Sequence, residues 1–162
     1  MTATFPGGTN MKKIIIISVV SVFIIIGLLS FLFYFDFFEM HKGEKAHGAA
    51  RDFYVTAQTL LTDEDIYNNI DDSFTLSSVD KYSDSSDAID SFKKELESKS
   101  KYKDYEYYIE VKDKGVTKII CSRSKYISTV GSYGPETVHC EGEKPIRNFM
   151  DEVKKSYDSF KP

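Results

Sequence analysis

Three histidines are the first side chains in this sequence that could bind a metal or transfer a proton. His41 and His47 lie six positions apart, whereas two ligands on one helical face lie four apart, and His139 is remote from both. The serines are numerous, but none stands in a Gly-x-Ser-x-Gly or Ser-x-x-Lys motif with a plausible base. We therefore expect no catalytic residue, no metal site and no cofactor, and we interpret the protein as not being an enzyme.

The acidic stretch DEDIYNNIDD, residues 63–72, is rich in the oxygen donors that calcium prefers. An EF-hand loop needs a glycine at its sixth position and a glutamate at its twelfth. Asn68 and Phe74 occupy those positions here. The stretch is therefore predicted to be a solvated turn rather than a calcium loop.

Tyrosines gather in one short segment and could recognise a ligand. Tyr102, Tyr105, Tyr107 and Tyr108 could form an aromatic shelf for a sugar or a partner protein. The alternative is that they are strand residues half buried on a sheet, and this alternative is the commoner arrangement.

A long uncharged run lies near the start of the sequence. Lys12 and Lys13 precede its twenty-two residues, 14–35. A secretory signal has a shorter apolar core of about 7–15 residues and a small-residue cleavage site, but bulky and charged residues follow this run. Twenty-two helical residues span roughly 33 Å, close to the hydrocarbon thickness of a bilayer. The sequence predicts one retained transmembrane helix at 14–35.

The orientation follows from the flanking charges. Lys12 and Lys13 flank the start of the span, while Asp36 and Glu39 follow its end. Because positive residues stay on the cytoplasmic side, we expect 1–13 in the cytoplasm and 36–162 outside the cell membrane as a single-pass protein.

Charge also limits the possible partners. All 25 acidic residues and 19 of the 21 basic residues follow residue 35, which leaves this part mildly acidic. A nucleic-acid partner needs a basic face, so we expect none. The part is long enough for one small domain with a modest core.

Apolar spacing predicts the elements of this domain. An amphipathic helix is expected over 46–61, a short turn capped by Thr62 follows, and a second helix is expected after a cap at Ser85 or Ser86. The alternation in YEYYIEV and the turn KDKG predict a β-hairpin, after a possible short strand in DSFTLSSV. Further antiparallel strands are expected at 126–134 and 136–140, and a C-terminal helix from Pro145. The predicted fold class is α+β.

This layout resembles the type IV pilins and pseudopilins, especially the pilin-like proteins of Gram-positive bacteria. The stretch AARDFYVTAQTLLTDED resembles the exposed half of a pilin's long helix, and the hairpin with its closing VGSYGP resembles the pilin sheet. Pilins also carry a cleavage site and a glutamate five residues into the mature chain, whereas here Ile14 follows the lysines directly and Ser18 stands near the glutamate position.

The resemblance implies a membrane-anchored structural or assembly protein of a surface pilus or secretion apparatus. Its partners would be the membrane, copies of itself or other pilin-like subunits. The alternative interpretation is a membrane-tethered extracytoplasmic module that binds a ligand or acts as a sensor.

Cys121 and Cys140 are the only two cysteines of the chain, and both lie in the part expected outside the membrane. A disulfide between them is the predicted state, because oxidation is allowed there and no other partner exists in the chain. Many pilins close a C-terminal loop in this way. The alternative is two reduced, buried thiols that act as small apolar residues.

Overall fold

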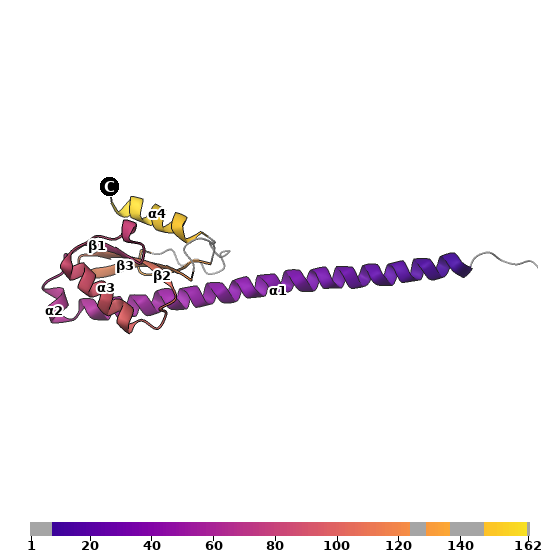
Figure 1. Cartoon of the computed structure of the whole chain (residues 1–162), viewed down its shortest axis with the longest axis horizontal. Coiled ribbons are helices and arrows are strands. Elements are labelled where there is room, and N and C mark those ends of the chain that lie inside the picture. The colour runs from indigo at the N-terminus through magenta and orange to yellow at the C-terminus, as the bar shows by residue number, and fades with distance from the viewer. Residues whose placement is uncertain (1–7, 124–128, 137–147, 162) are drawn as a thin grey trace, which may run out of the picture. The chain divides into compact units, whose positions relative to one another are not determined.

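The computed structural model describes residues 8–123, 129–136 and 148–161, without the side chains of 8–14 and 35–42. The chain divides into two units, a first unit Met1–Phe38 and a second unit Glu39–Pro162. The fold class is α+β, as predicted, with helices and one four-stranded antiparallel sheet (Figure 1).

Helix α1, Gly8–Leu61, contributes residues to both units. In the first unit its residues Ile15–Tyr34 form a stretch that is long and apolar enough to cross a membrane, and none of this stretch is buried. Exposure of isoleucine, valine, leucine and phenylalanine side chains to water is unfavourable, and the hydrocarbon of a bilayer would cover them. The predicted apolar helix is therefore present at the predicted position.

In the second unit, α1 presents one buried face whose residues follow the helical spacing. All seven residues predicted for this face are at most 2% exposed: Ala46, Ala49, Ala50, Phe53, Ala57, Leu60 and Leu61. Four alanines in this face let the helix backbone come close to its neighbours. The predicted amphipathic helix over 46–61 is confirmed.

The sheet is a meander in the order β1-β2-β3-β4, with every neighbouring pair antiparallel. Its strands are β1 Phe74–Ser77, β2 Glu106–Lys112, β3 Gly115–Ser122 and β4 Gly131–Tyr133. Asp113 and Lys114 link β2 to β3 with positive φ angles of 50° and 58°, the backbone of a tight hairpin turn. The predicted hairpin and the short first strand are confirmed.

The two faces of the sheet belong to two different cores. Alternate strand residues such as Leu76, Ile109 and Ile119 join α1 and helix α3 (Asp87–Lys99) in the larger cluster. On the opposite face, Tyr108 and Ile120 pack with residues of helix α4 (Phe149–Phe160). The sheet is therefore covered by helices on both faces.

Helix caps explain where the shorter helices begin. Ser86, one of the two predicted caps, accepts a hydrogen bond from the Ile89 N–H at 3.2 Å and starts α3. Asn148 accepts one from the Asp151 N–H and starts α4. The predicted start of that helix, Pro145, lies outside the described residues. Within α4, Phe149 and Val153 are fully buried, as their spacing predicted.

Three boundary predictions need correction. Thr62 does not cap the turn after α1, because its hydroxyl donates to the Thr59 carbonyl, and Asp63 caps the short helix α2, Glu64–Tyr67, instead. Of the strand expected at 126–134, residues 126–128 lie outside the described residues; β4 covers Gly131–Tyr133, since Gly134 adopts a positive φ of 132° and ends it. Glu136 lies in a turn, and the rest of the expected strand at 136–140 is outside the described residues.

Candidate functional site

A pocket lies where the start of β2 meets α1 and α3, within the second unit. Its cavity is open to solvent and measures about 460 Å³. Phe53 of α1, Glu97 of α3 and Ser78 after β1 contribute walls, and the loop 100–105 with the first residues of β2 completes it. We call it the tyrosine pocket because Tyr102, Tyr105 and Tyr107 line it.

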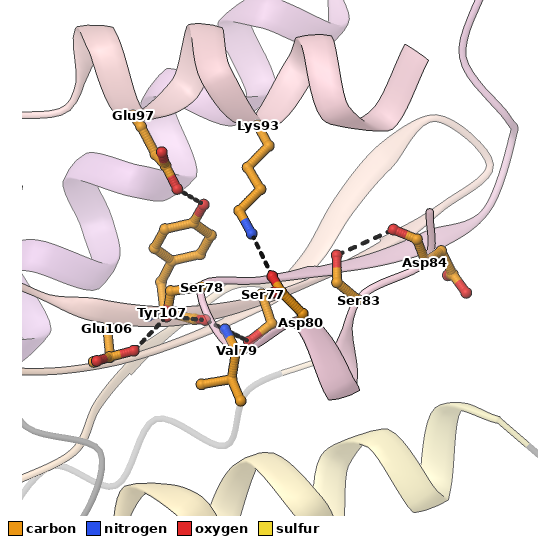
Figure 2. A network of polar contacts seen from close by, with 10 residues as sticks. All are labelled: Ser77, Ser78, Val79, Asp80, Ser83, Asp84, Lys93, Glu97, Glu106 and Tyr107. Atoms are coloured by element: carbon orange, nitrogen blue, oxygen red, sulfur yellow. Dashed lines mark hydrogen bonds and ion pairs between the residues drawn. The ribbon is translucent and has the colours of Figure 1, made fainter. Parts of the chain in front are cut away.

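Tyr107 is the buried wall of the pocket. Its side chain is 2% exposed, and its ring packs at 4.8 Å from the ring of Phe53. The hydroxyl reaches across to α3 and donates to Glu97 Oε1 at 2.8 Å, as Figure 2 shows. Burial and the neighbouring Glu97 carboxylate raise the pKa of Tyr107 well above its usual value. The hydroxyl therefore stays neutral and acts as a donor.

Ser78 orients the second carboxylate of the pocket. Its Oγ accepts the Tyr107 N–H at 3.0 Å and donates to Glu106 Oε2 at 2.8 Å (Figure 2). The backbone N–H of Ser78 in turn donates to the Tyr107 carbonyl at 3.1 Å. These bonds continue the β1–β2 ladder beyond the last paired residue of β1 and place Glu106 at the rim.

The loop 100–105 is held in place by a carboxylate of α1. Asp52 accepts a hydrogen bond from the Ser100 hydroxyl at 3.2 Å and one from the Lys101 N–H at 3.1 Å. Beyond this anchor, Tyr102 and Tyr105 meet edge to face with their centroids 5.4 Å apart. Both tyrosines remain half-buried. The aromatic part of the pocket is thus fixed before any ligand arrives.

The charge of the pocket is predominantly negative. Glu97, Asp104 and Glu106 line it, against Lys103. Asp104 is partly neutralised because Arg123 Nε lies 3.1 Å from its carboxylate. Burial and the Asp104 charge raise the pKa of Tyr105, so this ring also stays neutral. The arrangement can accept hydrogen bonds and offer aromatic surface, and it suits a cationic or hydroxyl-rich group.

The structure separates the four tyrosines of the predicted shelf. Tyr102, Tyr105 and Tyr107 share the pocket, whereas Tyr108 points to the other face of the sheet because neighbouring strand residues alternate. Phe53, Ser78 and Glu97 were not singled out as site residues from the sequence. No local signal could have found them, since they come from α1, the end of β1 and α3.

Beneath α4, the opposite face of the sheet is unusually polar for a buried surface. Tyr108 is fully buried and Glu110 is 3% exposed. The Tyr108 hydroxyl oxygen and Glu110 Oε1 find no hydrogen-bond partner in the described part of the chain. Burial raises the pKa of Glu110, and Lys118 only partly offsets this effect. Both side chains are enclosed.

The remaining candidate residues do not gather into one site. His47 lies in α1, where its Nδ1 is 3.2 Å from the Ser132 N and 3.1 Å from the Ser132 carbonyl oxygen. His41 also lies in α1, where only its backbone is described, and His139 lies outside the described residues. In the described ranges no three His, Cys, Asp or Glu side chains are grouped as metal ligands.

The residues of the predicted disulfide and the membrane-flanking lysines are only partly described by the structure. Cys121, near the end of β3, is a fully buried free thiol, and burial raises its pKa well above the usual value. Cys140 lies outside the described residues, so the pairing stays a prediction. Lys12 and Lys13 are helical positions in α1, and their side chains are outside the description.

Fold and pocket together define an α+β protein that carries one apolar helix of membrane length and an acidic, tyrosine-lined pocket. No protein-family model, curated protein or solved structure matches the chain.

Proposed function

We propose that this protein is a membrane-anchored, pilin-like structural or assembly subunit of a surface pilus or secretion apparatus. The observation that carries the proposal is the dual use of α1. One stretch of this helix, Ile15–Tyr34, is apolar on every side, and a later stretch packs its alanine-rich face against an antiparallel meander. A helix used in this way anchors and packs, and catalysis has no part in it.

The proposal includes an orientation and a mode of assembly. Lys12 and Lys13 would hold residues 1–13 in the cytoplasm, so that the second unit lies outside. Subunits would meet through residues 14–35 in the membrane. The glutamate with which pilins neutralise a neighbour's N-terminus is replaced here by Ser18, so assembly would depend on packing alone.

The assembly part can be tested by photocrosslinking in native membranes. A photoreactive residue at Phe23, in the apolar stretch, should give covalent products with copies of this chain or with pilin-type proteins. The same residue at Val55, an exposed position of α1 in the second unit, serves as the control. Ser18→Glu should increase the yield. Absence of crosslinks from Phe23 and from other positions in 14–35 would refute assembly through the membrane helix.

The orientation has its own test. A tag after Pro162 should be digested when protease is added to intact cells, while an N-terminal tag stays protected. Protection of the C-terminal tag would overturn the orientation and with it the surface role.

The tyrosine pocket favours a second candidate function, a membrane-tethered module that binds a ligand outside the cell. An open cavity of about 460 Å³ is within the size range of small-ligand sites. Its walls come from separate elements and are held by hydrogen bonds among themselves. In this function the apolar helix would serve only as a tether.

A further inference from the structure

We propose that the tyrosine pocket binds an organic cation, an alkylammonium or guanidinium group, through the rings of Tyr102 and Tyr105 and the carboxylates of Glu97 and Glu106. This inference rests on the second of the two proposed functions, and it names the chemistry of the ligand.

The first argument is the way in which the carboxylates are held. Glu97 Oε1 accepts a hydrogen bond from the Tyr107 hydroxyl, and Glu106 Oε2 accepts one from the Ser78 hydroxyl. Each bond engages one of the two oxygens of the carboxylate and fixes its position. The second oxygen of each remains able to accept a charged N–H group. Charge-assisted hydrogen bonds of this kind are about twice as strong as neutral ones.

The aromatic rings supply the second argument. Tyr102 and Tyr105 meet edge to face at 5.4 Å and are half-buried at the pocket, so part of their surface is available to a ligand. The face of a tyrosine ring attracts a cation through its quadrupole. Lys114 already lies over the ring of Tyr67 at 4.2 Å elsewhere in this protein, so the chain itself contains the contact that the ligand would make.

Preorganisation is the third argument. Asp52 binds the Ser100 hydroxyl and the Lys101 N–H, and thereby holds the loop that carries Tyr102 and Tyr105. A loop ordered in advance loses little conformational entropy when a ligand binds. The exposed Lys103 repels cations and Arg123 offsets the charge of Asp104, so the net negative charge of the pocket comes from Glu97 and Glu106. Cations are thus the charge class that the pocket selects.

Binding is tested on the full chain in detergent micelles, with tyrosines labelled for NMR. The n-butylammonium ion and the uncharged 1-butanol form one probe pair. The acetylated and amidated tripeptides Ala-Lys-Ala and Ala-norleucine-Ala form the second. Both cations should shift the signals of Tyr102 and Tyr105 and leave Tyr67 unchanged, and both neutral probes should have no effect. The tighter of the two cations shows whether a free amine or a protein side chain is the preferred source.

Variants then assign the binding to the pocket. Glu97→Gln keeps an acceptor for the Tyr107 hydroxyl but removes the charge, and with Glu106→Gln it should weaken cation binding by at least about fivefold. Glu95→Gln is the matched control, because Glu95 lies on the same helix and pairs with Lys99 outside the pocket. It should leave the affinity unchanged.

Two results would overturn the inference: equal binding of the cation and its neutral isostere, or an affinity that the double variant leaves unchanged. Neither result bears on assembly, because the crosslinking test uses residues in the membrane helix. Loss of crosslinks, in turn, leaves the cation test intact.

Discussion

The backbone of Gly131 in β4 lies directly against the backbone of Ala46 in α1. A Cβ atom at position 131 would stand 2.0 Å from the Ala46 carbonyl carbon and 2.2 Å from its oxygen. The adjacent Ser132 N–H donates to His47 Nδ1 at 3.2 Å, so a side-chain bond reinforces the approach. The edge strand is thereby joined to the helix through contacts that no other residue type at 131 would permit.

Gly131→Ala should therefore destabilise the second unit by about 3 kcal/mol or more, because the three nearest atoms that the new methyl meets, two of Ala46 and one of His47, belong to the backbone. Gly43→Ala is the control, since its Cβ would meet only a Thr129 methyl group at 3.5 Å. That change should be neutral or stabilise the helix by up to about 1 kcal/mol. Urea unfolding followed by the near-ultraviolet tyrosine signal measures both. Equal effects at the two glycines would contradict the close approach.

Phe53 links the helix, the core and the tyrosine pocket. It is 2% exposed and packs on Tyr107 at 4.8 Å. Phe53→Ala should reduce the free energy of unfolding by about 3–5 kcal/mol, because it leaves a cavity in the main core. Val55→Ala, on the exposed face of the same helix, should change it by less than about 0.5 kcal/mol. A small effect at Phe53 in urea unfolding would show that the core is elsewhere.

The carboxylate of Asp84 binds Lys161 at the end of α4, and this interaction should be sensitive to acid. Lys161 Nζ lies 2.8 and 2.7 Å from its two carboxylate oxygens, and Thr75 donates to it through N–H and hydroxyl. Burial opposes ionisation of Asp84, but the bonds from Lys161 and Thr75 prevail and lower its pKa. A group whose folded pKa is lowered stabilises the fold above its unfolded pKa of about 3.9 and loses this contribution as the pH falls.

Acid titration of the tyrosine NMR signals should accordingly show loosening of the Tyr82–Tyr157 contact as the pH falls below about 4. Asp84→Asn should show a weakened contact already at neutral pH and lose the acid dependence. Asp158→Asn, which removes the exposed partner of Lys154 on α4, should behave as the wild type. An acid response that survives Asp84→Asn would assign the effect to another carboxylate.

Glu110 should act in the opposite sense. Burial raises its pKa, so the folded state binds a proton more tightly than the unfolded state does. Its contribution is therefore most favourable at low pH and declines as the pH rises through the folded pKa. Glu110→Gln should increase the free energy of unfolding at pH 7 and remove this decline. Urea unfolding between pH 4 and pH 8 tests it, with Glu95→Gln, at a partly exposed position of α3, as the control. A variant that is less stable than the wild type at pH 7 would contradict the prediction.

If the second unit lies outside the membrane, as proposed, Cys121 and Cys140 should be joined in the native protein. By the chain-entropy relation a bridge of this span contributes about 3 kcal/mol. Mass spectrometry of the unreduced protein should find the linked peptides, and reduction should lower the midpoint of unfolding. Labelling of both cysteines as free thiols without reduction would establish the alternative of two buried thiols.

The sequence by itself determined the elements that are built from short-range patterns. The uncharged run located the apolar helix, the three-to-four spacing located the buried face of α1 around Phe53, and the alternation in β2 with the turn at Asp113 located the hairpin. Each of these signals is complete within a few turns or a few strand residues, because helix and strand periodicity are local properties of the chain. Boundaries were less well determined, as the cap at Asp63 instead of Thr62 shows.

Only the tertiary structure decided which faces were covered and which residues met. Alternation places Tyr107 and Tyr108 on opposite faces, but it does not tell that α4 buries Tyr108 and Glu110 while α1 and α3 enclose Tyr107. The pocket joins Phe53, Ser78 and Glu97, and the need for glycine at 131 arises from a helix 85 positions away. Such contacts depend on how whole elements pack, and a local sequence pattern does not specify which distant element will pack against it.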